Sequence, residues 1–139
     1  AGDPVEIWGP GSQTRSFLYV DECVEATYRL MQSDFPGPVN IGSEEMISMN
    51  DFAQMVINIS AKDLSIYNID GEEFEAKYGH RCPVGVNGRN SDNTLYKEKI
   101  GWSVSQPLID GMEKTYSWIA ERVRKREAGE EDVNYLAHT

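Results

Sequence analysis

The stretch Gly9–Glu25 reads GPGSQTRSFLYVDECVE and decides the fold. Its two glycines, Gly9 and Gly11, predict a turn whose backbone can come close to a ligand. A short strand over residues 16–20 is expected next, and Asp21 is placed to cap an amphipathic helix that ends near residue 33. The same alternation of short strands and helices continues along the chain, which predicts an α/β fold rather than a helical bundle.

Arg15 stands directly after the glycine turn. Its planar guanidinium presents a fork of donors that suits phosphate or carboxylate. The position therefore predicts an anion site, and an ordinary surface ion pair is the alternative interpretation.

Composition narrows the class of protein. The chain has 139 residues, of which 40% are hydrophobic, enough for one domain with a core. The net charge of −10 argues against sequence-independent nucleic-acid binding, which needs a positive field. Charged residues interrupt every apolar run, so we expect no membrane span, no signal peptide and a cytoplasmic location.

The remaining elements follow from periodicity and capping signals. Strands are expected at residues 5–8, 39–41 and 64–69. Ser48 and Asp51 resemble a capping box at the start of a helix whose core-facing stripe is Phe52, Met55, Val56 and Ile59.

Further helices are expected from Asp92 to Lys99, stopped by Gly101, and from Pro107 onward. The stripe Val20, Val24, Thr27 and Met31 marks one face of the first helix, and the last helix is expected to bury Leu108, Met112, Thr115, Ile119 and Val123.

Residues 1–126 form one predicted portion, with an irregular insertion at about 70–87 and a polar tail at 127–139. Within the insertion, residues 72–78 are able to form a helical turn. The strands are too few and too short for a self-sufficient parallel sheet, so the chain is interpreted as one lobe cut from a longer protein. Apolar surface is expected to be exposed where another lobe would pack.

A second cluster, Gly88–Asn93, reads GRNSDN. Arg89 lies between a glycine and a polar, helix-capping run, so Arg15 and Arg89 together are able to clamp a diphosphate. Alternatively, residues 90–92 are simply turn and cap residues and Arg89 is solvated.

Other candidate sites are weaker. Cys23 and Cys82 lack C-x-x-C spacing and are expected to be reduced thiols. His80 and Cys82 supply only half of the ligands that a structural zinc needs, and His138 lies in the tail. No metal site is predicted.

The quoted stretch resembles the segment G-x-G-x-x-x-R-x-F-x-x-V of the extended short-chain dehydrogenase/reductase superfamily, in its nucleotide-sugar epimerases and dehydratases. QTRSF at 13–17, DECVE at 21–25, VNIGSEEMISMN at 39–50 and GRNSDN at 88–93 resemble the GDP-mannose 3,5-epimerase family in particular. The resemblance covers nearly the whole chain and implies the C-terminal, substrate-binding lobe of such an enzyme.

That family uses tightly held NAD to oxidise C4 of the hexose, inverts C5 and C3, and reduces C4 again. The resemblance therefore implies GDP-mannose or a related nucleotide sugar as ligand, GDP-L-galactose as product and a homodimer as the complete enzyme. It implies that Gln13, Thr14, Arg15 and Arg89 contact the substrate. Thr139 aligns less securely with a further contact.

The departures from the family matter equally. The chain has no G-x-x-G-x-x-G loop and no Tyr-x-x-x-Lys pair, so no cofactor-binding or catalytic residue is expected in it, and NAD would be bound by an N-terminal portion. This chain alone is expected to be inactive. The alternatives are another nucleotide-sugar epimerase or dehydratase of the superfamily, or a stand-alone binding module.

Overall fold

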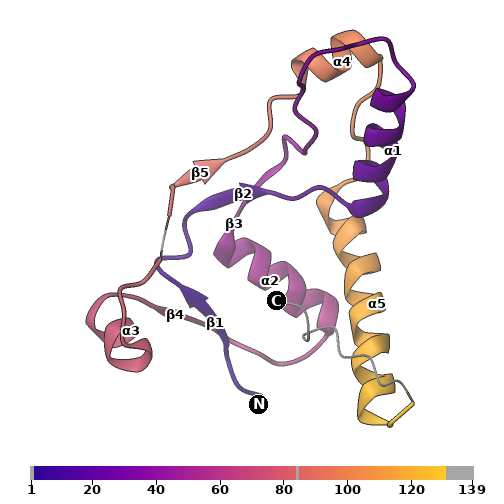
Figure 1. Ribbon diagram of the computed structural model, residues 1–139. Coiled ribbons are helices and arrows are strands. Elements are labelled where there is room, and N and C mark those ends of the chain that lie inside the picture. The colour runs from indigo at the N-terminus through magenta and orange to yellow at the C-terminus, as the bar shows by residue number, and fades with distance from the viewer. Residues whose placement is uncertain (1, 84, 131–139) are drawn as a thin grey trace.

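A computed structural model describes residues 2–83 and 85–130. Its elements run in the order β1 (Val5–Trp8), β2 (Thr14–Ser16), α1 (Val20–Met31), β3 (Met46–Ser48), α2 (Met49–Ser60), β4 (Ile66–Ile69), α3 (Gly71–Tyr78), β5 (Gly88–Arg89), α4 (Thr94–Ile100) and α5 (Leu108–Glu127). Short strands alternate with helices along the chain (Figure 1), which confirms the predicted α/β class.

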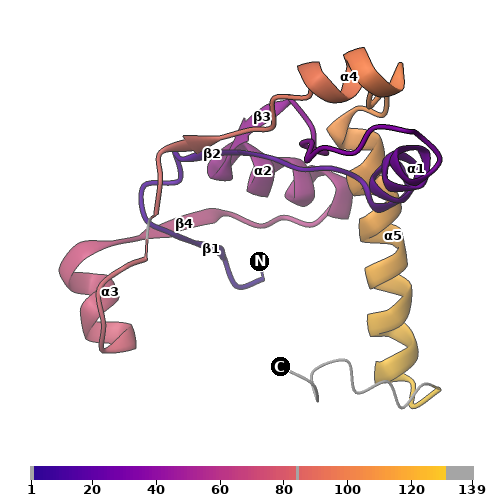
Figure 2. The same cartoon turned by 45° about the horizontal axis from the view of Figure 1, so that its top comes forward.

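The strands form two small sheets. β1 pairs in parallel with β4, from Val5 opposite Ile66 to Trp8 opposite Ile69. β2 is the central strand of the other sheet, antiparallel to β3 and parallel to β5. α2 lies between the two sheets in both views (Figures 1 and 2), and it contacts β1, β3, β4 and α5. Helix α2 is therefore the centre of the lobe.

The predicted start of α2 is confirmed. Ser48 is the N-cap residue, and its hydroxyl accepts a hydrogen bond from the Asp51 backbone N–H at 3.0 Å. The apolar side of α2 differs from the prediction. Ala53 and Ile57 are its most deeply buried residues, while the expected stripe is half-buried. α2 packs against strands on two sides, so the contact surface is wider than one helical stripe.

A second packing centre joins α1, α4 and the start of α5. Ala26 of α1 and Tyr96 of α4 are both buried, and the Tyr96 hydroxyl donates to the Ala26 carbonyl at 2.8 Å. Gly101 ends α4 in the left-handed region with φ of 71°, as predicted. Asp92 lies one residue before the N-cap Asn93, and its carboxylate accepts from the Thr94 N–H.

Two predictions about the deciding stretch were wrong. The strand occupies Thr14–Ser16 instead of residues 16–20, because the pairing with β3 and β5 covers only these positions. Phe17 leaves the sheet and its ring stacks on Phe52 of α2, with centroids 4.4 Å apart. Asp21 is not the N-cap; Tyr19 holds that position, and Asp21 lies in the first turn, where a negative charge favours the helix dipole.

Three more predictions were wrong elsewhere. Residues 39–41 form no strand, since side-chain hydrogen bonds to the 90–93 segment hold them instead. Pro107 precedes α5 as its N-cap rather than lying in its first turn. Ile119 and Val123 are exposed, not buried, because the other described residues leave this part of α5 uncovered.

The insertion at about 70–87 contains a complete helix, α3, where the sequence allowed a helical turn. Asp70 caps it by accepting from the Gly71 N–H at 2.7 Å, and Gly79 ends it with φ of 75°. Phe74 of α3 is fully buried. A helix of eight residues with one buried side chain leaves no sustained period in the sequence, which explains the difference from the predicted irregular segment.

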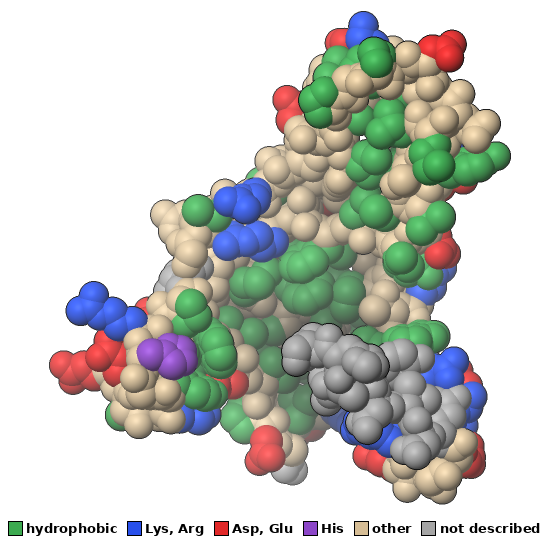
Figure 3. Space-filling view, in the orientation of Figure 1, with side chains coloured by type: hydrophobic (Ala, Val, Ile, Leu, Met, Phe, Trp, Pro, Cys, Tyr) green, Lys and Arg blue, Asp and Glu red, His purple; other side chains and the backbone are tan. Residues whose placement is uncertain are grey.

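Apolar side chains remain exposed over a large area. Hydrophobic atoms gather over α2 and along α1 in Figure 3. On α1 the stripe is formed by Val20, Val24, Tyr28 and Met31, each more than half exposed. An exposed apolar surface was predicted, and this stripe on α1 is one. No helix in the described part of the chain is long and apolar enough to cross a membrane.

Candidate functional site

Arg15 of β2 and Arg89 of β5 are direct register partners in the parallel strand pair. Partners in register lie on the same face of a sheet, so the two side chains start side by side. The two arginines are 74 positions apart in sequence, and the two-residue strand β5 brings them together. The fold therefore places Arg15 and Arg89 at adjacent positions on one face of the sheet.

Both arginines line a cavity of about 530 Å³. Its other lining residues are neutral: Ser16, Leu18, Val39, Asn40, Ile41, Gly42, Ser43, Asn90 and Ser91. No carboxylate is among these described lining residues, although the chain as a whole carries a net charge of −10. A cavity with two guanidinium groups and no acid is suited to an anion with more than one charge.

The walls of this cavity are held by side-chain amides and a glycine. Asn93 donates to the Gly42 carbonyl at 2.8 Å, and Asn40 donates to the Asp92 carbonyl at 3.2 Å. A Cβ atom at Gly42 would lie only 2.5 Å from the Ser91 Cβ, so the two walls approach closely because this residue is glycine. Hydrogen bonds from Thr94 lower the pKa of Asp92 and keep its carboxylate charged next to the wall.

The Arg15 guanidinium is fixed by backbone carbonyls. Its Nη1 donates to the Thr14 oxygen at 2.7 Å and to the Val86 oxygen at 3.0 Å. Among the described residues no carboxylate pairs with Arg15. Its remaining N–H groups are therefore available to an anion, so the alternative of a surface ion pair does not describe this residue.

The other two predicted contacts lie differently. Gln13 is buried, its Nε2 donates to the Trp8 carbonyl at 3.2 Å, and its Oε1 has no hydrogen-bond partner among the described residues. Thr14 alternates with Arg15 along β2 and faces Gly88, where an added Cβ would come within 2.9 Å of its hydroxyl. Neither lines the cavity. Their contact with substrate stays a prediction, and Thr139 and His138 lie outside the described residues.

The cysteines and the remaining histidine do not assemble into a site. Cys23 is exposed and Cys82 half-buried, and both are free thiols. Burial, with a smaller contribution from Asp70, raises the pKa of Cys82, which keeps it protonated. The described part of the chain contains no cluster of His, Cys, Asp and Glu that could hold a metal ion.

The junction between β4 and α3 does not fit the pyrophosphate of NAD. β4 leads into α3 at a strand-to-helix junction, where a pyrophosphate would need glycines and free N–H groups. Instead Asp70 occupies the cap, and Glu72 and Glu73 make the first turn acidic. The negative charge at this junction is unfavourable for a pyrophosphate.

Reasoning from sequence missed part of the cavity. Residues 39–41 were expected to be a strand, yet residues 39–43 form one wall of the cavity, and Asn40 and Asn93 hold that wall in place. A usable signal was the presence of amide side chains on both VNIGS and GRNSDN, since Asn often bonds to backbone groups in loops.

The sequence and the fold of this chain both match those of known proteins. The sequence model of the family described as GDP-mannose 4,6 dehydratase matches residues 2–115. The chain belongs to that family. It is 49% identical over 132 residues to a GDP-mannose 3,5-epimerase of Arabidopsis thaliana, and 47% identical over 131 residues to GDP-mannose 3,5-epimerase 1 of Oryza sativa subsp. indica.

These relatives cover 95% and 94% of this chain, which confirms the resemblance to GDP-mannose 3,5-epimerases. The chain spans 32% of the length of each relative. Among solved structures, it is similar to UDP-glucuronic acid 4-epimerase from Bacillus cereus, with a TM-score of 0.71 and 25% identity. That match covers 86% of this chain and 36% of the other, and it confirms the fold as part of an extended short-chain dehydrogenase/reductase.

Proposed function

We propose that this chain is the substrate-binding portion of an NAD-dependent GDP-mannose 3,5-epimerase. In this proposal Arg15 and Arg89 bind the diphosphate of GDP-mannose. The observation that carries it is the register pairing of these two arginines in a cavity whose described lining residues include no acid. The identity of 47% and 49% to GDP-mannose 3,5-epimerases supports the choice of this nucleotide sugar.

The chemical contribution of this chain is binding and orientation. Two adjacent guanidinium groups neutralise a diphosphate and present it with fixed, directional hydrogen bonds. The hexose attached to that diphosphate is then held in one position, which lowers the entropic part of the barrier for a reaction at its ring. The redox chemistry at C4 would depend on NAD held by another portion of the protein, and this chain alone would be inactive.

The test uses the protein encoded by the complete open reading frame. After purification its mass and bound nucleotide are measured, and the products formed from GDP-mannose are analysed by chromatography and NMR. The proposal expects bound NAD and a 3,5- or 5-epimer of the sugar. A protein that carries NAD but leaves GDP-mannose unchanged would refute the substrate assignment.

A second candidate is another nucleotide-sugar epimerase or dehydratase of the same superfamily. The similarity to the UDP-glucuronic acid 4-epimerase favours it. Parallel incubations with UDP-glucuronic acid and a dTDP-hexose distinguish this candidate, because only the preferred nucleotide sugar would be converted. A stand-alone binding module would convert none of them and would contain no NAD.

We further propose that the complete enzyme is a cytoplasmic homodimer that binds neither nucleic acid nor membrane. The support is the resemblance to this enzyme family and the net charge of −10. Light scattering of the purified protein measures its mass in solution, and a monomer would exclude the dimer.

A further inference from the structure

The position of the Arg15 side chain depends on a segment that follows α3. Arg15 Nη1 donates to the Val86 carbonyl at 3.0 Å, which joins β2 to the end of the insertion. Gly85, the residue before Val86, also lies close, since a Cβ built there would be 3.7 Å from Arg15 Nη2. The segment 85–86 therefore covers one side of the guanidinium.

Strand pairing alone fixes this segment weakly. β5 consists of only Gly88 and Arg89, both exposed, and a two-residue strand adds few ladder hydrogen bonds. One further backbone bond, from the Thr14 N–H to the Asn87 carbonyl at 2.8 Å, extends the pairing by a single residue. A second anchor on the chain before Val86 would therefore have a measurable effect on the position of the Arg15 side chain.

Helix α3 is such an anchor because it has its own packed aromatic core. Phe74 is fully buried, and its ring meets Trp8 of β1 edge-on with centroids 5.1 Å apart. On the same helix the Tyr78 ring centroid lies 4.6 Å from that of Phe74. His80 follows the helix, and its ring centroid lies 5.4 Å from that of Phe74. The chain therefore leaves α3 from a fixed point on β1.

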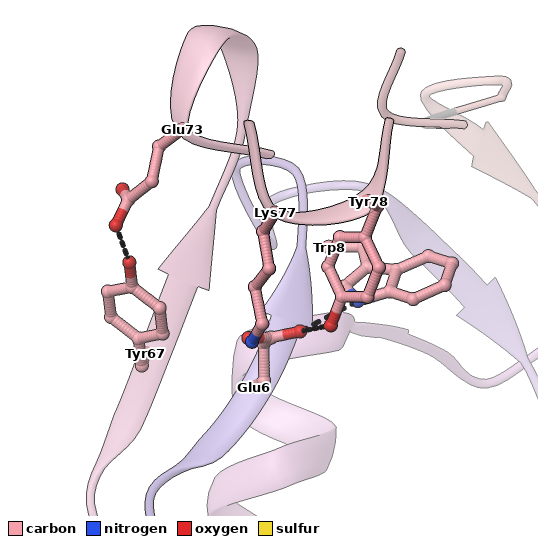
Figure 4. Close-up of polar contacts among 6 residues, drawn as sticks. All are labelled: Glu6, Trp8, Tyr67, Glu73, Lys77 and Tyr78. Carbon is pink, nitrogen blue, oxygen red and sulfur yellow. Dashed lines mark hydrogen bonds and ion pairs between the residues drawn. The ribbon is translucent and has the colours of Figure 1, made fainter. Parts of the chain in front are cut away.

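Glu6 ties the last turn of α3 to β1. Its carboxylate accepts hydrogen bonds from the Lys77 ammonium and the Tyr78 hydroxyl, and from Trp8 Nε1 at 3.0 Å (Figure 4). Three donors therefore converge on one side chain, two of them from α3 and one from β1. On the neighbouring strand, Tyr67 donates to Glu73 and holds the first half of the same helix.

We propose that Glu6 is a positioning residue for Arg15. By holding Lys77 and Tyr78, it fixes α3 on β1, and the fixed helix keeps the Val86 carbonyl in place against the guanidinium. The insertion thereby restricts Arg15 to the orientation that faces the cavity. This inference rests on the proposed function, because the measured consequence is binding of a nucleotide sugar by Arg15.

The test is a double-mutant cycle in the complete protein, with GDP-mannose binding measured by isothermal titration calorimetry. Glu6→Gln removes the charge with little change in volume, and we expect it to weaken binding about 3- to 10-fold in the wild-type background. In an Arg15→Ala background the same substitution is expected to change binding by less than about 1.5-fold, since its effect passes through Arg15.

Glu72→Gln is the matched control. This substitution removes one negative charge from α3, the helix that Glu6 holds. Glu72 is exposed and makes no hydrogen bond to β1 among the described residues, so binding is expected to stay unchanged. If Glu6→Gln does not yield folded protein, Lys77→Met replaces it, because it removes the ammonium but keeps the apolar stem. Circular dichroism of each variant checks the fold.

Each outcome is decisive. An equal loss of binding in both backgrounds would show a purely structural role and overturn the inference. Normal binding by Glu6→Gln together with weak binding by Arg15→Ala would also overturn it, while leaving the proposed function intact. Unchanged binding by Arg15→Ala would instead refute the role of Arg15 in the proposed function, and the inference with it.

Discussion

Glu22 on α1 accepts a hydrogen bond from the backbone N–H of Ser105 at 2.7 Å, across 83 positions of sequence. The same oxygen accepts from the Gln106 N–H at 3.0 Å. These groups lie just before α5, whose N-cap is a proline that makes no side-chain cap bond. Glu45 completes the arrangement by accepting from the Leu108 N–H at 2.9 Å. One glutamate from α1 and one from the loop before β3 therefore replace a local cap.

Replacement of Glu22 by alanine should destabilise the protein. Glu22 is buried, and its loss leaves two backbone N–H groups without an acceptor, so we expect a decrease of about 2–4 kcal/mol in the free energy of unfolding. Urea unfolding, monitored by tryptophan fluorescence, measures this decrease in the free energy of unfolding. The control is Glu25→Gln on the same helix, whose exposed ion pair with Arg29 should contribute less than about 1 kcal/mol. Equal effects of the two substitutions would contradict this assignment.

The cap of α2 provides a second test of stability. Ser48→Ala removes the acceptor for the Asp51 N–H, and we expect a loss of about 1 kcal/mol. Ser117→Ala is the matched control, because Ser117 lies inside α5 and its hydroxyl only donates to the Glu113 carbonyl. That control should change stability by less than about 0.5 kcal/mol in the same urea experiment. A Ser48→Ala protein as stable as the control variant would show that the capping box contributes little.

The success at Ser48 explains which features can be predicted from sequence. A helix cap involves residues three positions apart, so local chemistry decides it. The same holds for Gly101, where the left-handed conformation ends α4. In contrast, the bounds of β2 depend on pairing with β3 and β5, which lie far away in sequence, and the predicted strand was displaced accordingly.

Both arginines of the candidate site were chosen from the sequence, whereas their arrangement was not predictable from it. Arg15 and Arg89 were recognisable because each follows a glycine turn or a glycine, and the family resemblance singled them out. Their register pairing and the wall at residues 39–43 required the fold. The contacts of Glu6 were not predictable, since they join β1 to a helix whose short sequence gave no sustained period.

Glu6 should also make stability depend on pH in the acid range. Hydrogen bonds from Lys77 and then Tyr78 lower the pKa of Glu6 from 4.5 to about 2. Because the folded-state pKa is depressed, its contribution is fully present above pH about 4.5 and is lost as the pH falls towards about 2.

The measurement is the free energy of unfolding of wild type minus that of Glu6→Gln, followed from neutral pH down to pH about 2. We expect a constant difference above pH about 5 and a steady decrease below it. Glu72→Gln should show no such decrease relative to wild type. A difference that stays constant over the whole range would mean that the Glu6 carboxylate is not held by these donors.

The arginine pair gives the most direct prediction about function. Arg15→Ala and Arg89→Ala in the complete protein should each weaken GDP-mannose binding by about 1.5–3 kcal/mol, the range for hydrogen bonds to charged groups. Because the two residues are register partners that would share one diphosphate, the double variant should lose less than the sum of the single losses. Arg15→Lys should fall between wild type and alanine, since it keeps the charge but loses the planar fork.

Arg81→Ala is the control for overall charge, because Arg81 is 94% exposed and only pairs loosely with Glu75 at 3.7 Å. The affinity of Arg81→Ala for GDP-mannose should match that of wild type, measured by calorimetry at one ionic strength. Strict additivity of Arg15→Ala and Arg89→Ala would indicate that the two guanidinium groups bind separate parts of the ligand. Unchanged affinity in both single variants would remove the diphosphate site from this cavity, because no other cationic side chain lines it among the described residues.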